Sequence, residues 1–196
     1  MASDEQPFAE IEHALKRAAA ALREAGIPFL LGGSLASWAR GGPETTHDLD
    51  FMLKPEDAER ALEVLCATGM KAERPPEEWL YKVWDGDVLI DLIYGPSGIE
   101  MTDEVIERGD VLNVLSMELR VMSLEDVLTT KLEALTEHEL DYSGALEIAR
   151  ALREQIDWQA VRERTEGSPY AKAFFVLVEE LGIAPAAEEA SVDGVT

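Results

Sequence analysis

The sequence contains a single cysteine and no long apolar run. Cys66 has no second cysteine in the chain with which to form a disulfide, and one cysteine excludes a metal site built from several thiolates. No apolar segment approaches the roughly 18 residues that a membrane-spanning helix needs. The first residues, MASDEQPFAE, contain no apolar stretch of the kind found in secretory signals. We therefore expect a cytoplasmic protein with no membrane partner.

Basic residues are scarce beside acidic ones. Seventeen Lys and Arg stand against forty Asp and Glu, which gives a formal net charge of −23. This charge repels nucleic acid and anionic membranes at long range, so we expect no bulk DNA binding. It leaves room for a local basic site and for phosphates bridged by a metal. Hydrophobic residues make up 46% of the chain, which is enough for a folded core.

Apolar periodicity and turn signals divide the chain into two parts and a tail. In the first part, residues 1–122, helices are predicted at 8–25, 35–40 and 55–68, and strands at 29–31, 48–53, 79–84, 88–94, 111–115 and 118–122. Residues 123–184 have a helical pattern throughout, with Ser123, Asp157 and Ser168 at expected helix starts. The small, acidic residues 185–196 are expected to form a disordered tail. The sequence therefore predicts a mixed α/β half followed by a helical half.

Two aspartates open the predicted strand 48–53. Residues two apart in a strand face the same side, with Cα atoms about 7 Å apart, so Asp48 and Asp50 point together. Because like charges on one face repel each other, the pair requires a cation or open solvent. A solvated strand face is one interpretation. The remainder of the strand is apolar on both faces, which favours a central strand whose beginning opens into a cleft.

A third aspartate, Asp91, lies in an almost wholly apolar predicted strand with the sequence VLIDLIY. Burial of an unpaired carboxylate is costly, so Asp91 requires a partner. Three carboxylates from two neighbouring strands would form an oxygen-rich pocket suited to Mg²⁺. The alternative is a structural ion pair of Asp91 with Lys82 or Arg120.

Gly32, Gly33 and Ser34 lie between the predicted strand 29–31 and the short helix that follows it. Glycine lets a ligand approach the backbone closely, and the first N–H groups of a helix can bind phosphate. A tight turn between strand and helix is the simpler interpretation. The aspartate strand that follows at short range favours the phosphate interpretation.

Two segments, LLGGSLASWARGGPETTHDLDFML and VLIDLIYG, together resemble the DNA polymerase β-like nucleotidyltransferase superfamily over residues 29–94. The helical half, SLEDVLTTKLEALTEHELDYSGALEIARAL, resembles the helical part of the AbiEii and MenT-type toxin nucleotidyltransferases. The resemblance implies an α+β fold in which a nucleotidyltransferase-type mixed sheet flanked by helices precedes a C-terminal helical bundle. It also implies an enzyme that moves a nucleoside monophosphate from an NTP to a hydroxyl group.

The resemblance assigns roles to particular residues of this chain. It implies Mg²⁺ as the cofactor, with Mn²⁺ as a substitute, and two metals that stabilise the attacking and leaving oxygens. The implied metal ligands are Asp48, Asp50 and Asp91; the implied nucleotide-binding residues are Gly32, Gly33, Ser34, Arg40 and Lys131; and the implied catalytic set is the three aspartates with Lys131 and Asp141.

Lys131 and Asp141 also have ordinary structural interpretations. Lys131 follows Val127 and Leu128 at helical spacing, so it lies on or beside the buried side of its helix, and the chain has only six lysines. A surface lysine is the alternative. For Asp141 the alternative is a helix N-cap.

The sequence departs from the family pattern just before the first aspartate. Many relatives have a basic residue there, whereas this chain has Glu44, and Arg40 would supply the missing charge. His47 would face the other side of the strand and is not assigned as a metal ligand. Trp79 and Trp84 lie near the expected sheet edge, and the sequence assigns neither a role.

Three functions are consistent with the sequence. A toxin-like enzyme would modify a tRNA 3′ end or a protein side chain and would have an antitoxin as a partner. An antibiotic nucleotidyltransferase would modify an aminoglycoside or a lincosamide. A noncatalytic member of the family would act by binding alone. The helical half favours the first function, the acidity favours a cationic acceptor, and the presence of all three aspartates argues against the third.

Overall fold

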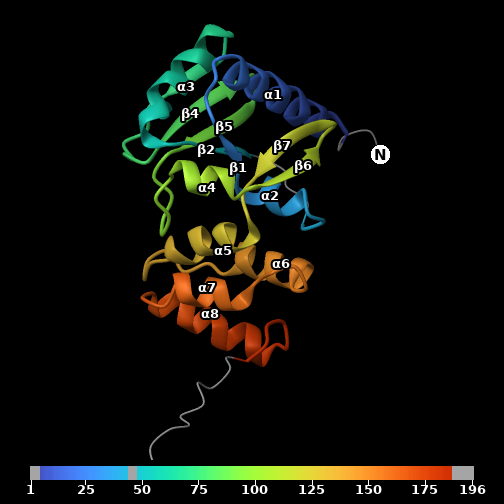
Figure 1. Cartoon of the computed structure of the whole chain (residues 1–196), viewed down its shortest axis with the longest axis vertical. Helices are drawn as coiled ribbons and strands as arrows, with labels where there is room; N and C mark the ends of the chain where they lie inside the picture. The colour runs from blue at the N-terminus through green and yellow to red at the C-terminus, as the bar shows by residue number, and fades with distance from the viewer. Residues whose placement is uncertain (1–4, 44–47, 187–196) are drawn as a thin grey trace, which may run out of the picture.

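A seven-stranded mixed sheet forms the first half of the chain in the computed structural model, which describes residues 5–43 and 48–186 (Figure 1). Across the sheet the strands are β3 (Lys71–Glu73), β4 (Leu80–Asp85), β5 (Val88–Ile93), β2 (Asp48–Met52), β1 (Leu30–Leu31), β7 (Met117–Val121) and β6 (Asp110–Val114). β2 runs parallel to β5, and β1 runs parallel to β7, while the other neighbours are antiparallel. β2 and β5 therefore lie side by side near the middle of the sheet.

The helices form layers around this sheet. They are α1 (Glu5–Glu24), α2 (Gly33–Trp38), α3 (Pro55–Ala67), α4 (Asp103–Glu107), α5 (Leu124–Glu133), α6 (Ser143–Leu152), α7 (Trp158–Arg164) and α8 (Pro169–Glu180). Figure 1 shows α1 and α3 together at one end of the molecule and α5 to α8 stacked at the other. α5 contacts α2 of the first half as well as α6, α7 and α8, so it joins the two halves.

The alternation of side chains along β2 and β5 separates a buried face from a polar one. Leu49 and Phe51 of β2 and Ile90 and Leu92 of β5 are fully buried in the core, on the side that α1 and α3 cover. Because side chains alternate along a strand, the residues between them point to the opposite face, toward α2 and α5. The apolar face fixes the two strands, and the polar face is left for the aspartates.

The structure confirms the predicted α+β class with its mixed sheet and its later helices, and it adds two short elements. β3 is three exposed residues that pair with β4 at the edge of the sheet, which is too short to give an alternating pattern. α4 has five residues and begins at Thr102, whose hydroxyl accepts a hydrogen bond from the Val105 N–H at 3.3 Å. The same kind of cap occurs at the predicted helix starts Ser123, Asp157 and Ser168.

The predicted division near residue 122 coincides with a change of secondary structure, from β7 to α5. One continuous cluster of buried apolar side chains nevertheless extends from Ile11 to Ala184, and the division into separate units stays a prediction. Most of the predicted acidic tail, from residue 187, and the Glu44 to His47 segment lie outside the described residues. In the part of the chain that the structure describes, no helix combines the length and the apolar character needed to cross a membrane.

A buried carboxylate connects the helical half to the α/β half. The side chain of Asp126 in α5 is only 1% exposed and accepts hydrogen bonds from two arginines. Arg108, which directly follows α4, donates from Nε at 2.9 Å and from Nη2 at 2.7 Å, and Arg164 at the end of α7 donates from Nη1 at 2.7 Å. Asp126 lies three residues after Ser123, the spacing of a capping box, in which its side chain would bind the Ser123 N–H. In the structure the Asp126 backbone N–H meets the Ser123 hydroxyl, while its carboxylate binds the arginines.

We expect Asp126→Ala to lower the free energy of unfolding by about 3 kcal/mol, because the substitution breaks a buried, charge-assisted network by removing its central partner. Urea denaturation would measure the change as a lower midpoint at constant slope. Glu147→Ala, on the exposed face of α6, is the control and should shift the midpoint little. An Asp126→Ala protein as stable as the wild type would show that the arginines do not hold the two halves together.

Candidate active site

The pairing of β2 with β5 brings two of the predicted aspartates side by side. In this parallel pair Asp50 is in register with Asp91, and Asp48 is in register with Leu89. Residues in register on neighbouring strands point to the same face, so Asp48, Asp50 and Asp91 share one face of the sheet. Asp48 is exposed at the beginning of β2, whereas Asp50 and Asp91 are half-buried. The close pair is therefore Asp50 with Asp91.

A row of charged residues crosses the sheet at this level. Glu73 on β3, Lys82 on β4, Asp91 on β5 and Asp50 on β2 follow one another in register. Burial raises the pKa of Asp91, as do the nearby charges of Asp48 and Glu73, while Lys82 opposes the shift. Asp91 thus has a cation beside it and a carboxylate on its other side.

The ion pair that the sequence offers as an alternative role for Asp91 does not form. Lys82 is directly across from Asp91, but no ion pair joins their charged atoms. Arg120 donates instead to the carbonyl oxygens of Glu107, at 2.8 Å, and Gly109, at 3.0 Å. Among the residues that the structure describes, the buried Oδ1 of Asp91 has no hydrogen-bond partner. Asp91 therefore retains a coordination site for a cation or a proton.

The Asp50 carboxylate lies close to other negative charges. Burial, followed by the charges of Asp91 and Asp48, raises the pKa of Asp50 to about 6, and Lys131 is the one neighbour that opposes this shift. Two adjacent carboxylates that are both deprotonated repel each other, so the pair is stabilised by any bound cation. The electrostatics of the site therefore favour a divalent metal.

Gly33 provides the space that the Asp50 carboxylate occupies. Its φ is +56°, in the region that favours glycine, and a Cβ added to it would lie only 1.6 Å from Asp50 Oδ2. The preceding Gly32 N–H donates to the Asp50 carbonyl oxygen at 2.8 Å. Both glycines are thus packed against β2, and Ser34 follows them in the first turn of α2. At Gly33 the backbone therefore lies directly against the Asp50 carboxylate.

A cavity of about 340 Å³ lies between this face of the sheet and α5. Its polar end is formed by Gly33, Asp50 and Lys131. Its apolar end is formed by Met52, Trp79, Ile93, Pro96 and Val127. The volume is at the lower end of the range for small-molecule sites. The cavity therefore combines a charged end with an apolar one.

Lys131 approaches the aspartates from the helical half of the chain. It lies on α5, where it lowers the pKa of Asp50, and its Nζ is 3.5 Å from the position that a Cβ on Gly144 would take. The Lys131 ammonium group forms no ion pair and no hydrogen bond with the residues that the structure describes. The ammonium group is therefore available to an anion in the cavity.

Two other predicted residues are engaged elsewhere. The Arg40 side chain is 8% exposed and donates to the Ala36 carbonyl at 2.9 Å and to Asp110 Oδ2 at 2.7 Å. Asp141 Oδ1 accepts a hydrogen bond from the Ser143 N–H at 2.9 Å, and hydrogen bonding by Ser143 lowers the pKa of Asp141. Asp141 thus contacts the beginning of α6 from one residue before the N-cap, which is Tyr142 and not Asp141 as the structural interpretation proposes. Neither residue lines the cavity.

The carboxylates suit a metal that also takes ligands from a substrate. Within the described part of the chain, no three Asp, Glu, His or Cys side chains are grouped closely enough to enclose an ion. Mg²⁺ is usually bound through one or two carboxylates together with waters and substrate phosphates. Asp50 and Asp91, with the unpartnered Oδ1 of the latter, fit that requirement. The donor set is thus suited to Mg²⁺ that takes its remaining ligands from water or from phosphate oxygens.

The sequence did not assign a role to Trp79 or to the loop of residues 95–97, which also lines the cavity. The sequence does contain one indication of the loop's position, because the loop directly follows the strand that contains Asp91.

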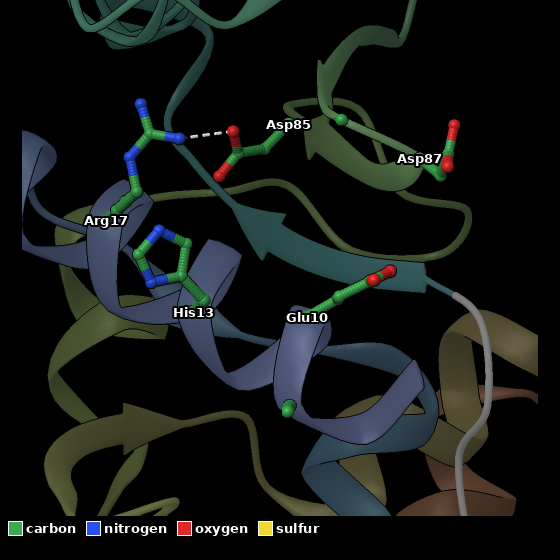
Figure 2. A pocket seen from close by; sticks show the side chains of 7 residues that line it. Glu10, His13, Arg17, Asp85 and Asp87 are labelled. Carbon is green, nitrogen blue, oxygen red and sulfur yellow. Dashed lines mark hydrogen bonds and ion pairs between the residues drawn. The ribbon is translucent and has the colours of Figure 1, made fainter. Parts of the chain in front are cut away.

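A second cavity, of about 510 Å³, lies between α1 and the β4–β5 turn (Figure 2). There Arg17 points to Asp85, with which it forms an ion pair, and also donates to the Thr68 carbonyl at 2.8 Å. This second cavity contains none of the predicted site residues.

The chain is similar to known proteins in sequence and in fold. The sequence model of a family described as "uncharacterised nucleotidyltransferase" matches residues 9–179. No curated protein matches the chain. The solution structure of the antibiotic-resistance factor ANT(2″)-Ia is similar over 87% of this chain and 96% of its own, with a TM-score of 0.60 and 16% identity.

Two crystal structures are similar as well. That of ANT(2″)-Ia in complex with adenylyl-2″-tobramycin covers 83% of this chain and 98% of its own, with a TM-score of 0.61 and 15% identity. That of JHP933 from Helicobacter pylori covers 91% of this chain and 80% of its own, with a TM-score of 0.55 and 15% identity. At such identities the likeness shows the fold.

We expect Asp50→Asn to raise the free energy of unfolding by about 3 kcal/mol at pH 7.5 in the absence of divalent cations. The pKa of Asp50 is raised from 3.8 to about 6 in the folded chain, so its ionisation opposes folding, and stability falls as the pH rises between these two values. The gain should nearly vanish at pH 4, where the folded wild type keeps its proton.

Urea denaturation at the two pH values would measure this difference. Asp87→Asn, at the exposed β4–β5 turn, is the control and should give no comparable gain. A gain for Asp50→Asn that is the same at pH 4 and pH 7.5 would contradict the electrostatic explanation.

Proposed function

The chain belongs to the nucleotidyltransferase family whose model it matches, and on this premise we propose that it transfers a nucleoside monophosphate from an NTP to a hydroxyl group in a Mg²⁺-dependent reaction. The observation that carries the proposal is the pair of half-buried carboxylates, Asp50 and Asp91, held in register beside a cavity that also contains Lys131. A carboxylate pair and a free ammonium group are complementary to a metal-bound triphosphate.

Asp50 and Asp91 would hold Mg²⁺, or Mn²⁺ in its place, together with phosphate oxygens of the substrate. Asp48, which is exposed at the beginning of β2, does not complete a three-carboxylate group with them, so the predicted set of three metal ligands is reduced to two. When bound, the metal would neutralise phosphate charge and lower the pKa of the acceptor hydroxyl. Asp91 would also accept the proton of the attacking hydroxyl, through the carboxylate oxygen that does not bind the metal. The acceptor oxygen forms a bond to the α-phosphorus as the bond to pyrophosphate breaks, and pyrophosphate leaves.

Lys131 compensates the charge of the β- and γ-phosphates as a point cation. The N–H groups of Gly33 and Ser34, in the first turn of α2, would contact the same phosphates. Arg40 is paired with Asp110 and Asp141 with the beginning of α6, so we leave both out of the proposed mechanism.

We propose a small cationic molecule with hydroxyl groups, such as an aminoglycoside, as the acceptor. The net charge of −23 attracts a cation, and it repels the backbone of tRNA. The likeness to ANT(2″)-Ia, whose structure contains adenylyl-2″-tobramycin, supports this choice at the level of the fold. A tRNA or protein acceptor, kinship with the AbiEii and MenT-type toxins and an antitoxin partner stay predictions from the sequence.

A label-transfer experiment tests the proposal. The purified full chain would be incubated with Mg²⁺, each α-labelled NTP and one of four acceptor pools: aminoglycosides, lincosamides, total tRNA and a protein lysate. We expect label on an aminoglycoside. Label on tRNA or on a protein would support the toxin-like function instead. The absence of both transfer and NTP binding would contradict the proposed reaction.

Asp50→Asn and Asp91→Asn should each reduce transfer by about a thousandfold or more, because each removes charge that acts in the transition state. Both proteins should remain folded, as near- and far-UV circular dichroism would show. Asp87→Asn is the matched control and should keep full activity. Substantial turnover in Asp91→Asn would exclude Asp91 as the proton acceptor.

Lys131→Met keeps the length and the apolar stem of the side chain but removes its charge. We expect the Kd for Mg-NTP to rise about 10- to 100-fold, since a charge-assisted contact to phosphate is lost. Titration calorimetry would measure the change, with Lys172→Met on the exposed side of α8 as the control. Equal affinities in Lys131→Met and wild type would show that α5 does not contribute to the nucleotide site.

A further inference from the structure

We propose that the apolar end of the cavity binds the nucleobase of the NTP and that the base stacks on the indole of Trp79. The inference rests on the proposed function, because it assumes that the polar end holds the triphosphate. It goes further by assigning a residue and a chemical class of ligand to the opposite end. An NTP has the same division, with charge at one end and a flat aromatic group at the other.

Backbone hydrogen bonds hold Trp79 in place, whereas much of the residue is exposed to solvent. Its carbonyl accepts hydrogen bonds from the N–H groups of Tyr94, at 3.0 Å, and Gly95, at 3.1 Å, which attaches it to the end of β5. A Cβ on Gly95 would lie 3.0 Å from the Cβ of Trp79, so the two segments are in close contact. The whole residue is nevertheless 45% exposed.

The polar atom of the indole is also uncommitted. Over the two described stretches, 5–43 and 48–186, the N–H of Trp79 makes no hydrogen bond. Trp84 on β4, the strand that begins directly after Trp79, differs because its Nε1 donates to Glu73 Oε2 at 2.9 Å. A large, rigid aromatic side chain that lines a cavity without a partner of its own is a suitable stacking surface.

The position of the cavity indicates that the base, rather than the acceptor, occupies it. The cavity contains Asp50 and Lys131, whereas Asp91, the proposed proton acceptor, does not line it. Met52 and Ile93, in register at the ends of β2 and β5, begin the apolar end two residues beyond Asp50 and Asp91. The acceptor must reach Asp91, so it approaches from outside this cavity. The apolar end is thus left for the part of the nucleotide beyond the triphosphate.

The lining also predicts how selective the site is. Ser97 and Thr130 are the hydroxyl groups that line the cavity, and the Thr130 hydroxyl already donates to the Val127 carbonyl at 3.0 Å. Base stacking is tolerant of sequence because every base has an aromatic face. We therefore expect the affinities for the four NTPs to lie within about tenfold of one another, with purines favoured by their larger stacking area.

Two variants of Trp79 test the proposal. Calorimetry would measure Kd for the four α,β-methylene NTPs and for inorganic tripolyphosphate, each with Mg²⁺. Trp79→Ala should weaken nucleotide binding about 5- to 100-fold and leave tripolyphosphate binding unchanged. Trp79→Phe keeps an aromatic face and should retain most of the affinity. Trp84→Phe, outside the cavity, is the matched control and should match the wild type.

The other possible results of these measurements would contradict either this proposal or the proposed function. Unchanged nucleotide affinity in Trp79→Ala would overturn the proposal. So would an equal loss of nucleotide and tripolyphosphate affinity, which would indicate general damage to the cavity. A higher KM for the acceptor with unchanged nucleotide affinity would assign Trp79 to the acceptor and overturn it as well. A wild-type chain that binds neither tripolyphosphate nor NTP would instead contradict the proposed function itself.

Discussion

Repulsion between two carboxylates is the constraint on which the rest of the site depends. The parallel pairing of β2 with β5 holds Asp50 and Asp91 in register on a half-buried face, where neither can turn away from the other. Two lysines, one beside each aspartate, reduce this electrostatic repulsion. Lys82 lies across from Asp91 on the neighbouring strand, and Lys131 reaches Asp50 from α5. The folded chain therefore contains a charge imbalance that a bound cation would relieve.

Packing elsewhere in the molecule keeps the carboxylates in this position. On the other face of the same strands, Leu49 and Ile90 are fully buried and in register, so neither strand can slide or turn without exposing apolar surface. On the near side, Asp126 anchors α5 through Arg108 and Arg164, and α5 in turn carries Lys131. An apolar core thus fixes the aspartates, and a buried polar network fixes the lysine that faces them.

Local patterns predict much of the fold but only part of the site. The alternation along strand 48–53 predicts that Asp48 and Asp50 share a face, because that depends on neighbours in the chain. The register of Asp50 with Asp91 depends on contacts across the sheet, which no local pattern contains. The same holds for Arg40, whose partner is seventy residues away, and for Trp79, which faces a helix from the other half. Residue types predict the chemistry of the site, whereas tertiary contacts decide which residues take part.

The close fit of Gly33 against Asp50 has a consequence for how such a sequence can diverge. A Cβ at position 33 would overlap the Asp50 carboxylate, so the glycine is constrained for as long as that carboxylate keeps its place. Drift at one position is thereby coupled to the other over evolutionary time. A descendant with a side chain at position 33 must have moved or discarded the acid. That single position would therefore distinguish homologues that retain the ancestral chemistry from those that have abandoned it.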